Sequence, residues 1–289
     1  MIDMLDRRRF FAEELEAVCK LRSPALVEAF ATVPREQFLP PGPWTVMADS
    51  DFMGGLRLHP TPDANPARIH HNISVAIDPA RHLFNGQPGT IGMWIDALDL
   101  FAGARVLHVG CGLGYYTAVM AHCVGPTGRV AAFDVDPALA AQARQNLTSL
   151  PWTDARTGDG TLAPGETFDA VLVNAGVTHP LDVWLDSLAA GGRMVLPLTS
   201  TIPGMGPTLG KGLVMLLTKQ EGDFAVRVLA VVAIYSALGI RDDALSSRLG
   251  TSMMSGPMRW QAVKRLRRDV HEEQPGCWMH AARFCLSTS

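Results

Sequence analysis

The sequence predicts an α/β fold: a Rossmann-like, doubly wound and mostly parallel sheet with a C-terminal antiparallel hairpin. Short apolar strands alternate with helical segments between residues 105 and 198, which is the order of a parallel sheet covered by helices. A glycine-rich turn joins the first of these strands to the helix after it. Further on, the turn at 220–223 separates two β-rich segments, a pattern typical of a hairpin.

The N-terminal part predicts helices and then irregular structure. Apolar residues recur at helical spacing over 7–31, and Ser23 followed by proline supplies a capping hydroxyl at the start of a second helix. Residues 40–65 are rich in Pro, Gly and Asp, which indicates irregular covering structure. The segment 91–98 has one apolar helical face, with Asp96 on its polar side.

The alternating elements of the core can be placed in order. We expect strands at 105–109, 129–133, 170–173 and 194–198. We expect the helices between them at 115–122, 137–147 and 181–188, the second capped by Asp136 and the third stopping at Gly191-Gly192. The hairpin at the sheet edge comprises 213–218 and 225–235, and a further helix is expected at 260–270.

These elements suggest three parts. We expect an N-terminal helical cap and substrate-side segment at 1–79, a ligand-binding core at 80–240 and a C-terminal extension at 241–289.

Composition excludes several classes of protein. The 289 residues include 47% apolar and 18% charged residues, the balance of a folded globule. The 25 basic and 28 acidic side chains leave a net charge of −3, without the long-range field of a dedicated nucleic-acid binder. Five cysteines are too few and too scattered for a disulfide scaffold. Because no signal peptide or membrane span is evident in the sequence, we expect a cytoplasmic protein without membrane contacts.

The strongest chemical signal is the segment VLHVGCGLGYYTA at 106–118. Its glycines, Gly110, Gly112 and Gly114, allow the backbone to approach a ligand closely, and the following helix presents its N-terminal N–H groups. A dinucleotide fingerprint needs its third glycine one residue later, where Tyr115 stands. The G-x-G-x-G spacing is instead that of S-adenosyl-L-methionine-dependent methyltransferases.

Polar residues at later strand ends support the same ligand. Asp134 ends the second strand, where a carboxylate can accept both ribose hydroxyls of an adenosine. Asp159 lies in a turn suited to reading the adenine amino group, and Asn174 ends a strand at the carboxyl edge. Singly, each has an ordinary explanation as a strand end, a turn residue or a C-cap. Together with the glycine turn they predict a cofactor site formed by Gly110, Cys111, Gly112, Gly114, Tyr115, Asp134, Val135, Asp159, Gly160 and Asn174.

Several blocks between about residues 24 and 236 carry a family resemblance. They include Val33-Pro34-Arg35-Glu36, Gly86-Gln87 and Gly158-Asp159-Gly160-Thr161. With the glycine turn, these blocks resemble the protein-L-isoaspartate O-methyltransferase family. The resemblance implies the class I methyltransferase fold, S-adenosyl-L-methionine as cofactor, and methyl transfer to a carboxylate of a peptide, typically the α-carboxylate of an isoaspartyl residue.

The resemblance also suggests individual roles. Counted from Gly86, Thr90 takes the place of the family's serine beside the transferred methyl group, so Thr90 is the candidate catalytic residue. The resemblance also adds Gln87 and His108 to the predicted cofactor site, and His108 stands where the family usually has an acidic residue. A carboxylate acceptor is already ionised at pH 7 and needs no general base, and Arg81 could pair with it.

Other readings of the sequence remain open. A hydroxyl acceptor would need a base, for which His71, His82 and His179 are candidates. A small acid could replace the peptide, and a non-catalytic binding module could retain the fold. Nucleic-acid bases are disfavoured because Asn174 is not followed by the Pro-Pro-aromatic element of amino-group methyltransferases. The sequence does not predict an oligomeric state.

The extension has two further features. One is a possible zinc-ligand set, His271, Cys277, His280 and Cys285. Only one close pair, Cys277-x-x-His280, is present, so we expect a packed tail and no metal site. The other is the basic stretch 259–268, which we expect to be a solvated helix face.

Overall fold

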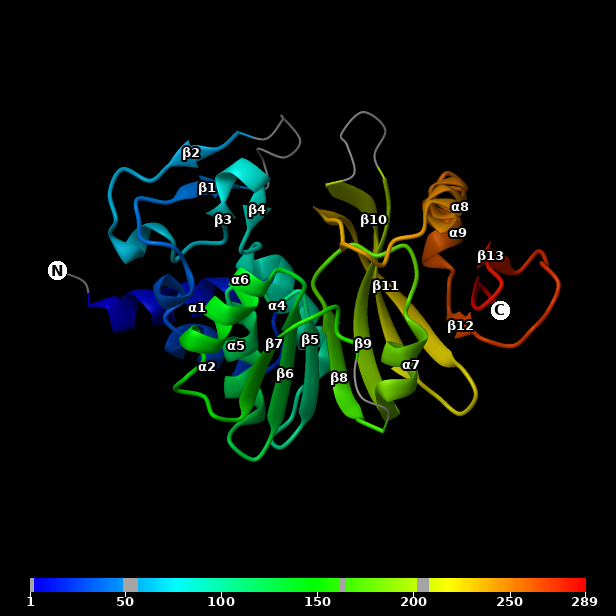
Figure 1. Ribbon diagram of the computed structural model, residues 1–289, viewed down its shortest axis with the longest axis horizontal. Helices are drawn as coiled ribbons and strands as arrows, with labels where there is room; N and C mark the ends of the chain where they lie inside the picture. Colours follow the sequence, from blue (N-terminus) through cyan, green and yellow to red (C-terminus); the bar gives the residue numbers. More distant parts are fainter. Residues whose placement is uncertain (1–2, 49–56, 162–164, 202–207) are drawn as a thin grey trace. The chain divides into compact units, whose positions relative to one another are not determined.

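The computed structural model describes residues 3–48, 57–161, 165–201 and 208–289 (Figure 1). The chain divides into two compact units. The first unit comprises Met1–Ala104 and Cys111–Thr157, and the second unit comprises Arg105–Gly110 and Gly158–Ser289. The boundaries predicted at 79/80 and 240/241 describe parts of the chain rather than these units, and they stay predictions.

Helices form much of the first unit. They are α1 (Met4–Cys19), α2 (Pro24–Thr32), α4 (Pro88–Leu98), α5 (Tyr115–Val124) and α6 (Pro137–Asn146). Ser23 caps α2 as predicted, with its side chain accepting from the Leu26 N–H at 3.3 Å. Asp96 is only 8% exposed, contrary to the polar helix side expected for it. Its carboxylate accepts from the backbone N–H groups of Arg22 and Ser23, and so joins α4 to the turn before α2.

A small antiparallel sheet begins in the segment predicted to be irregular and continues beyond it. Its strands, in the order β2-β1-β3-β4, are β1 (Thr45–Met47), β2 (His59–Pro60), β3 (Ser74–Asp78) and β4 (Leu83–Phe84). Trp44, Val46, Ile69 and Val75 form its core. Three single 3-10 turns accompany it, η1 (Arg35–Phe38), η2 (Pro66–Arg68) and η3 (Pro79–Arg81). The prediction for 40–65 was therefore wrong for β1 and β2, while residues 49–56 lie outside the described chain.

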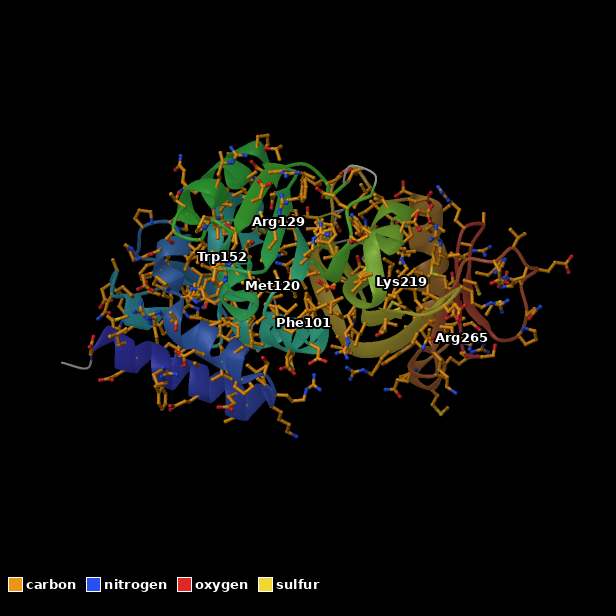
Figure 2. All side chains as sticks on the ribbon, turned by 90° about the horizontal axis from the view of Figure 1, so that it is seen from below. Phe101, Met120, Arg129, Trp152, Lys219 and Arg265 are labelled. Carbon is orange, nitrogen blue, oxygen red and sulfur yellow. The ribbon has the colours of Figure 1, made fainter. Side chains whose placement is uncertain are left out.

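The first unit also contains a parallel strand pair, β6 (Arg129–Asp134) and β7 (Thr153–Thr157). Asp136 caps α6 as predicted, accepting from the Ala138 N–H at 2.9 Å. Trp152, before β7, donates from its indole to the Ala121 carbonyl of α5 at 2.9 Å (Figure 2). The strand β7 was not predicted, because its sequence TDART has only one apolar residue, the buried Ala155.

The strands of the second unit form a mixed sheet in the order β13-β14-β12-β11-β10-β9-β8-β5. The parallel members are β5 (Arg105–Val109), β8 (Phe168–Val173) and β9 (Leu188–Thr201). The antiparallel members are β10 (Leu209–Lys219), β11 (Phe224–Tyr235), β12 (Arg265–Arg267), β13 (Cys277–His280) and β14 (Cys285–Ser287). The predicted α/β fold, with a parallel core followed by an antiparallel hairpin, is confirmed.

Two details of this sheet differ from the prediction. The hairpin β10–β11 is not at the edge, because β12 pairs with β11. Gly191-Gly192 lies within β9 rather than at a helix end, since α7 (Asp182–Ser187) is followed at once by the strand. Lys219 binds the end of α7 instead, donating to the carbonyls of Leu185, Asp186 and Leu188 at 3.3, 3.1 and 2.6 Å (Figure 2).

The extension contains α8 (Asp243–Met253) and α9 (Pro257–Gln261) before its strands. The helix predicted at 260–270 was wrong, because α9 ends at Gln261 and Leu266 is buried in β12 between β11 and β14. Three basic residues of this stretch are paired: Arg265 with Asp223, Arg267 with Asp269, and Arg268 with Asp186. Across the described ranges, no helix has the length and apolar character needed to span a membrane.

Candidate active site

The glycine turn leads into α5 with a backbone that only glycine adopts easily. Gly110, Gly112 and Gly114 have φ values of +78°, +55° and +92°. Within the first unit, the Cys111 N–H donates to the Phe133 carbonyl at 2.9 Å, and the Gly114 N–H donates to the Cys111 carbonyl at 2.9 Å. The turn is therefore hydrogen-bonded to the end of β6. Its three glycines present their backbone with no side chain of their own.

Asp134 holds this turn in place. One carboxylate oxygen accepts from the Gly112 N–H at 2.8 Å, and the other accepts from the Asp136 N–H at 3.0 Å. Asp134 is 9% exposed, and burial raises the pKa of its carboxyl despite these two hydrogen bonds. Because an ionised carboxylate has about four acceptor positions, both oxygens retain capacity for a ligand's hydroxyl groups.

The other predicted residues beside the turn have different environments. Val135 is 41% exposed and presents an apolar side chain beside Asp134. Cys111 is buried, and burial raises the pKa of its thiol, which stays protonated at neutral pH. The Tyr115 ring packs against Phe38 and Tyr116 in the core, so only its backbone N–H at the start of α5 is suited to a ligand.

Gln87 and Thr90 lie together at the start of α4. The Thr90 hydroxyl donates to Gln87 Oε1 at 2.8 Å, and Gln87 Nε2 donates to the Asn72 carbonyl at 3.0 Å. Asn72 also accepts from the Gly89 N–H at 2.6 Å through Oδ1. Both Gln87 and Thr90 are half-buried. The predicted catalytic hydroxyl is therefore already oriented by a neighbour that was predicted to bind the cofactor.

Arg35 positions this segment, a role that the sequence did not reveal. Its guanidinium is fully buried and donates to the carbonyls of Ile69, Ile73 and Gly86 at 2.9, 2.8 and 3.2 Å. Tyr116 donates from α5 to the same Gly86 carbonyl at 3.0 Å. Burial lowers the pKa of Arg35 from its ordinary value. In the sequence, the one sign of these hydrogen bonds was a charged residue inside the Val33-Pro34-Arg35-Glu36 block.

His108, Gly110 and Asn174 belong to the second unit and lie at neighbouring strands. The Asn174 N–H donates to the Val109 carbonyl at 2.8 Å, directly after the paired strands β5 and β8. His108 is fully buried in β5, and burial lowers its pKa to about 3, so the imidazole is neutral at physiological pH. The family's acidic residue is therefore replaced by an uncharged side chain.

The turn with Asp159 and Gly160 lies beside the same strand. Gly160 has φ +80°, and a Cβ on it would be 2.6 Å from Val109 Cγ2, so only glycine permits this close approach to β5. The indole of Trp184 donates to the Gly160 carbonyl at 3.2 Å. Asp159 accepts hydrogen bonds from the side chain and backbone of Thr161, which lower the pKa of its carboxyl. The second unit thus brings Asp159, Gly160 and Asn174 to the carboxyl end of β5 and β8.

The remaining candidates have other partners. Arg81 forms an ion pair with Asp136 at 2.7 Å. Its guanidinium would have to give up this ion pair to bind a substrate carboxylate. His179 Nδ1 lies 2.9 Å from Thr178 Oγ1, and burial lowers the pKa of this histidine. His71 and His82 are exposed. The geometry does not single out any of these histidines as a base.

The extension is anchored at its first residues. Arg241 donates to the Gly176 carbonyl at 2.7 Å and to the Thr199 carbonyl at 3.0 Å, and the Asp242 N–H donates to Thr178 Oγ1 at 3.0 Å. These contacts join the start of the extension to the segment that follows Asn174 and to β9.

Comparisons with known proteins place this architecture. Residues 66–211 match the family model described as protein-L-isoaspartate(D-aspartate) O-methyltransferase. A protein-L-isoaspartate O-methyltransferase of Methanothrix thermoacetophila is 33% identical over 190 residues, covering 64% of this chain and 79% of the relative. One from Methanococcus aeolicus is 27% identical over 238 residues, covering 78% and 95%.

Solved structures are similar in fold. A protein-L-isoaspartate O-methyltransferase structure superposes with a TM-score of 0.61 at 21% identity, covering 87% of this chain and 70% of the other. A Plasmodium falciparum chain assigned to the same activity, solved with S-adenosyl-L-homocysteine, gives 0.57 at 16% identity, covering 79% and 97%. At these identities the likeness is one of fold.

Proposed function

Because the chain belongs to the protein-L-isoaspartate(D-aspartate) O-methyltransferase family, we propose that it transfers a methyl group from S-adenosyl-L-methionine to a carboxylate of a peptide or protein. It is a methyltransferase of the class I fold. The most suitable acceptor is the α-carboxylate of an isoaspartyl residue.

One observation carries the cofactor assignment: the Asp134 carboxylate fixes Gly112 in a bare glycine turn at the start of α5. This arrangement fits a nucleoside, because the carboxylate retains acceptor positions and the three glycines add no side chains of their own to the turn. The residues proposed to hold the cofactor are Gln87, His108, Gly110, Cys111, Gly112, Gly114, Tyr115, Asp134, Val135, Asp159, Gly160 and Asn174. Cys111 and Tyr115 would act through their backbones.

When bound, S-adenosyl-L-methionine supplies an electrophilic methyl group on its sulfonium. An acceptor carboxylate is ionised at pH 7, so the reaction needs no general base. The protein therefore has to orient the acceptor and exclude water. Thr90 would steady this carboxylate by turning its O–H from Gln87 Oε1 toward the acceptor. Gln87 would keep its own position through its bond to the Asn72 carbonyl.

The test is an acceptor assay with methyl-labelled cofactor. Two peptides of one sequence, with an isoaspartyl or an ordinary aspartyl residue at one position, serve as matched acceptors. The proposal expects label on the isoaspartyl peptide that is released by mild base, as an ester requires. Base-stable label, or binding of S-adenosyl-L-homocysteine without transfer to either peptide, would contradict it. The second result would favour a binding module that retains the fold.

The proposal also covers the class of acceptor and the location of the protein. A small carboxylic acid as acceptor would be distinguished by label transfer that short acids support and peptides do not. A cytoplasmic location is part of the proposal and is supported by the few scattered cysteines. Near-neutral charge and the pairing of the basic side chains around β12 speak against nucleic acid as acceptor.

A further inference from the structure

The extension brings four metal-ligating side chains to one place. His271, Cys277, His280 and Cys285 each offer one ligand atom, and these atoms all lie within 4.8 Å of one another. The sequence shows only one close pair, Cys277-x-x-His280, which is why a packed tail was expected. Folding supplies the missing proximity, because His280 and Cys285 are directly opposite each other in the β13–β14 pairing.

The spacing suits a tetrahedral ion. Zinc binds thiolate sulfur at about 2.3 Å and imidazole nitrogen at about 2.0 Å, so a sulfur and a nitrogen of one tetrahedron lie about 3.5 Å apart. His271 Nε2 lies 3.5 Å from Cys277 Sγ. The rings of His271 and His280 meet edge to face with centroids 4.7 Å apart, so both imidazoles approach the same point.

Neighbouring groups orient these ligands. His271 Nδ1 lies 3.0 Å from the Asp269 carbonyl and 3.4 Å from the Asp269 carboxylate, which leaves Nε2 directed at Cys277. This is the arrangement that holds metal-binding histidines in one tautomer. The Gln274 N–H donates to Cys277 Sγ at 3.3 Å and would stabilise a thiolate there. Among the described residues, the buried His280 Nδ1 has no hydrogen-bond partner.

We propose that these four residues bind a zinc ion that stabilises the extension. Two thiolates and two neutral imidazoles balance the charge of Zn²⁺, with release of the two thiol protons on binding. Four protein ligands complete the tetrahedron and leave no position for water or substrate, so the site is structural. Its effect is to hold together the short hairpin β13–β14, which joins the rest of the sheet through three residue pairs between β14 and β12.

The ion would stabilise a part of the chain with little core of its own. Cys277 and Cys285 are buried free thiols, and the other buried apolar side chains of these short strands are Leu266, Trp278, Met279 and Leu286. A metal that joins the loop at His271 to both strands adds a link that this small core lacks.

The test measures metal in the full chain. Protein without a histidine tag is reduced, stripped with a chelator, incubated with a slight excess of ZnCl₂, dialysed and analysed by mass spectrometry of the elements. We expect close to one zinc ion per chain in the wild type, and its loss in Cys285→Ala and His280→Ala. The matched controls are Cys123→Ala, a buried cysteine of α5, and His59→Ala, an exposed histidine; both should retain the metal.

A second measurement does not depend on whether the variants fold. Cobalt(II) added to the stripped wild type should give the intense visible bands of tetrahedral coordination and a near-ultraviolet thiolate-to-cobalt band. Wild-type protein that binds neither ion overturns the proposal, as does metal retained in both ligand variants. A disulfide between Cys277 and Cys285 that persists in native protein without metal also overturns it. Because the assay needs no methyl transfer, its result is independent of the proposed catalytic activity.

Discussion

The Asp134 carboxylate accepts a hydrogen bond from the Gly112 N–H at 2.8 Å, so the last residue of β6 fixes the backbone of the glycine turn. The same carboxylate is the group proposed to bind the cofactor's ribose. One side chain thus shapes the binding turn and also supplies an acceptor to the ligand, and its removal affects both.

Replacing Asp134 with alanine should weaken cofactor binding. The loss of charge-assisted hydrogen bonds is worth on the order of 1.5–3 kcal/mol, or roughly 10- to 100-fold in Kd. Calorimetric titration with S-adenosyl-L-homocysteine measures the change. Asp154→Ala, which removes a β7 carboxylate held in exposed ion pairs, is the control and should leave Kd unchanged. An unchanged Kd in Asp134→Ala would remove Asp134 from the site.

Cofactor affinity should also depend on pH through Asp134. Burial raises the pKa of this carboxyl above the ordinary value of about 3.9, so the ionised form is lost earlier as pH falls. The effect of this raised pKa on folding stability runs in the other direction from its effect on cofactor binding. Asp134 contributes stability that is fully present below the ordinary pKa of the carboxyl and is lost as pH rises through the pKa of the folded state. Titrations between pH 7 and pH 4 should show Kd rising at low pH in the wild type. Asp134→Asn, which has no such titration, should show a flatter profile; identical profiles would refute the assignment.

Thr90 should affect turnover more than cofactor binding. Thr90→Val removes the hydroxyl proposed to steady the acceptor, and one charge-assisted hydrogen bond corresponds to about 10- to 100-fold in kcat/KM. Thr90→Ser should retain most activity on the isoaspartyl peptide. Both variants should bind S-adenosyl-L-homocysteine with wild-type affinity. Equal activity of Thr90→Val and the wild type would show that Thr90 does not contact the acceptor.

Gly160 should be sensitive to an added methyl group. In Gly160→Ala the new Cβ meets Val109 Cγ2 at 2.6 Å, and overpacking of this kind destabilises by about 1–3 kcal/mol. Gly165→Ala is a matched control, because Gly165 has a similar φ of +93° and none of the described residues has an atom within 4 Å of an added Cβ. Urea unfolding should show the larger loss for Gly160→Ala. Equal losses would mean that backbone strain alone matters at both positions.

Arg35 should be essential for stability. Arg35→Met leaves the carbonyls of Ile69 and Ile73 without this donor, whereas the Gly86 carbonyl keeps its hydrogen bond from Tyr116. Each group left unsatisfied on burial costs about 1–3 kcal/mol. We expect the free energy of unfolding to fall by about 3 kcal/mol or more, measured by urea titration. The control, Arg68→Met, removes an exposed ion pair with Asp63 and should change stability by less than about 1 kcal/mol.

The sequence predicted the elements whose local pattern agrees with their final environment. Strands β5, β6 and β8 are mostly apolar, and Ser23 and Asp136 cap their helices as the sequence suggests. Strand β7 escaped prediction because only Ala155 faces the core, so its strand form depends on pairing with β6. Strand β12 was mistaken for helix because its arginines resemble a charged helix face, whereas pairing with β11 and β14 determines its structure.

The candidate site was predicted by residue type but not by arrangement. Spacing located the glycine turn, and strand ends located Asp134 and Asn174. The sequence could not show that Tyr115 faces an aromatic core, that Arg81 pairs with Asp136, or that Arg35 binds four backbone carbonyls. Each of these depends on residues distant in sequence, whose approach only the folded chain determines.

The hydrogen bonds of the Arg241 guanidinium limit how far this enzyme can be truncated from its C-terminal end. A chain trimmed at Ile240, where the family resemblance fades, would lose the donor to the Gly176 and Thr199 carbonyls and expose the flank of β9. The extension is thus joined to β9 and to the segment after Asn174 by its first residues, Arg241 and Asp242, and a truncation that keeps these contacts would have to begin beyond them.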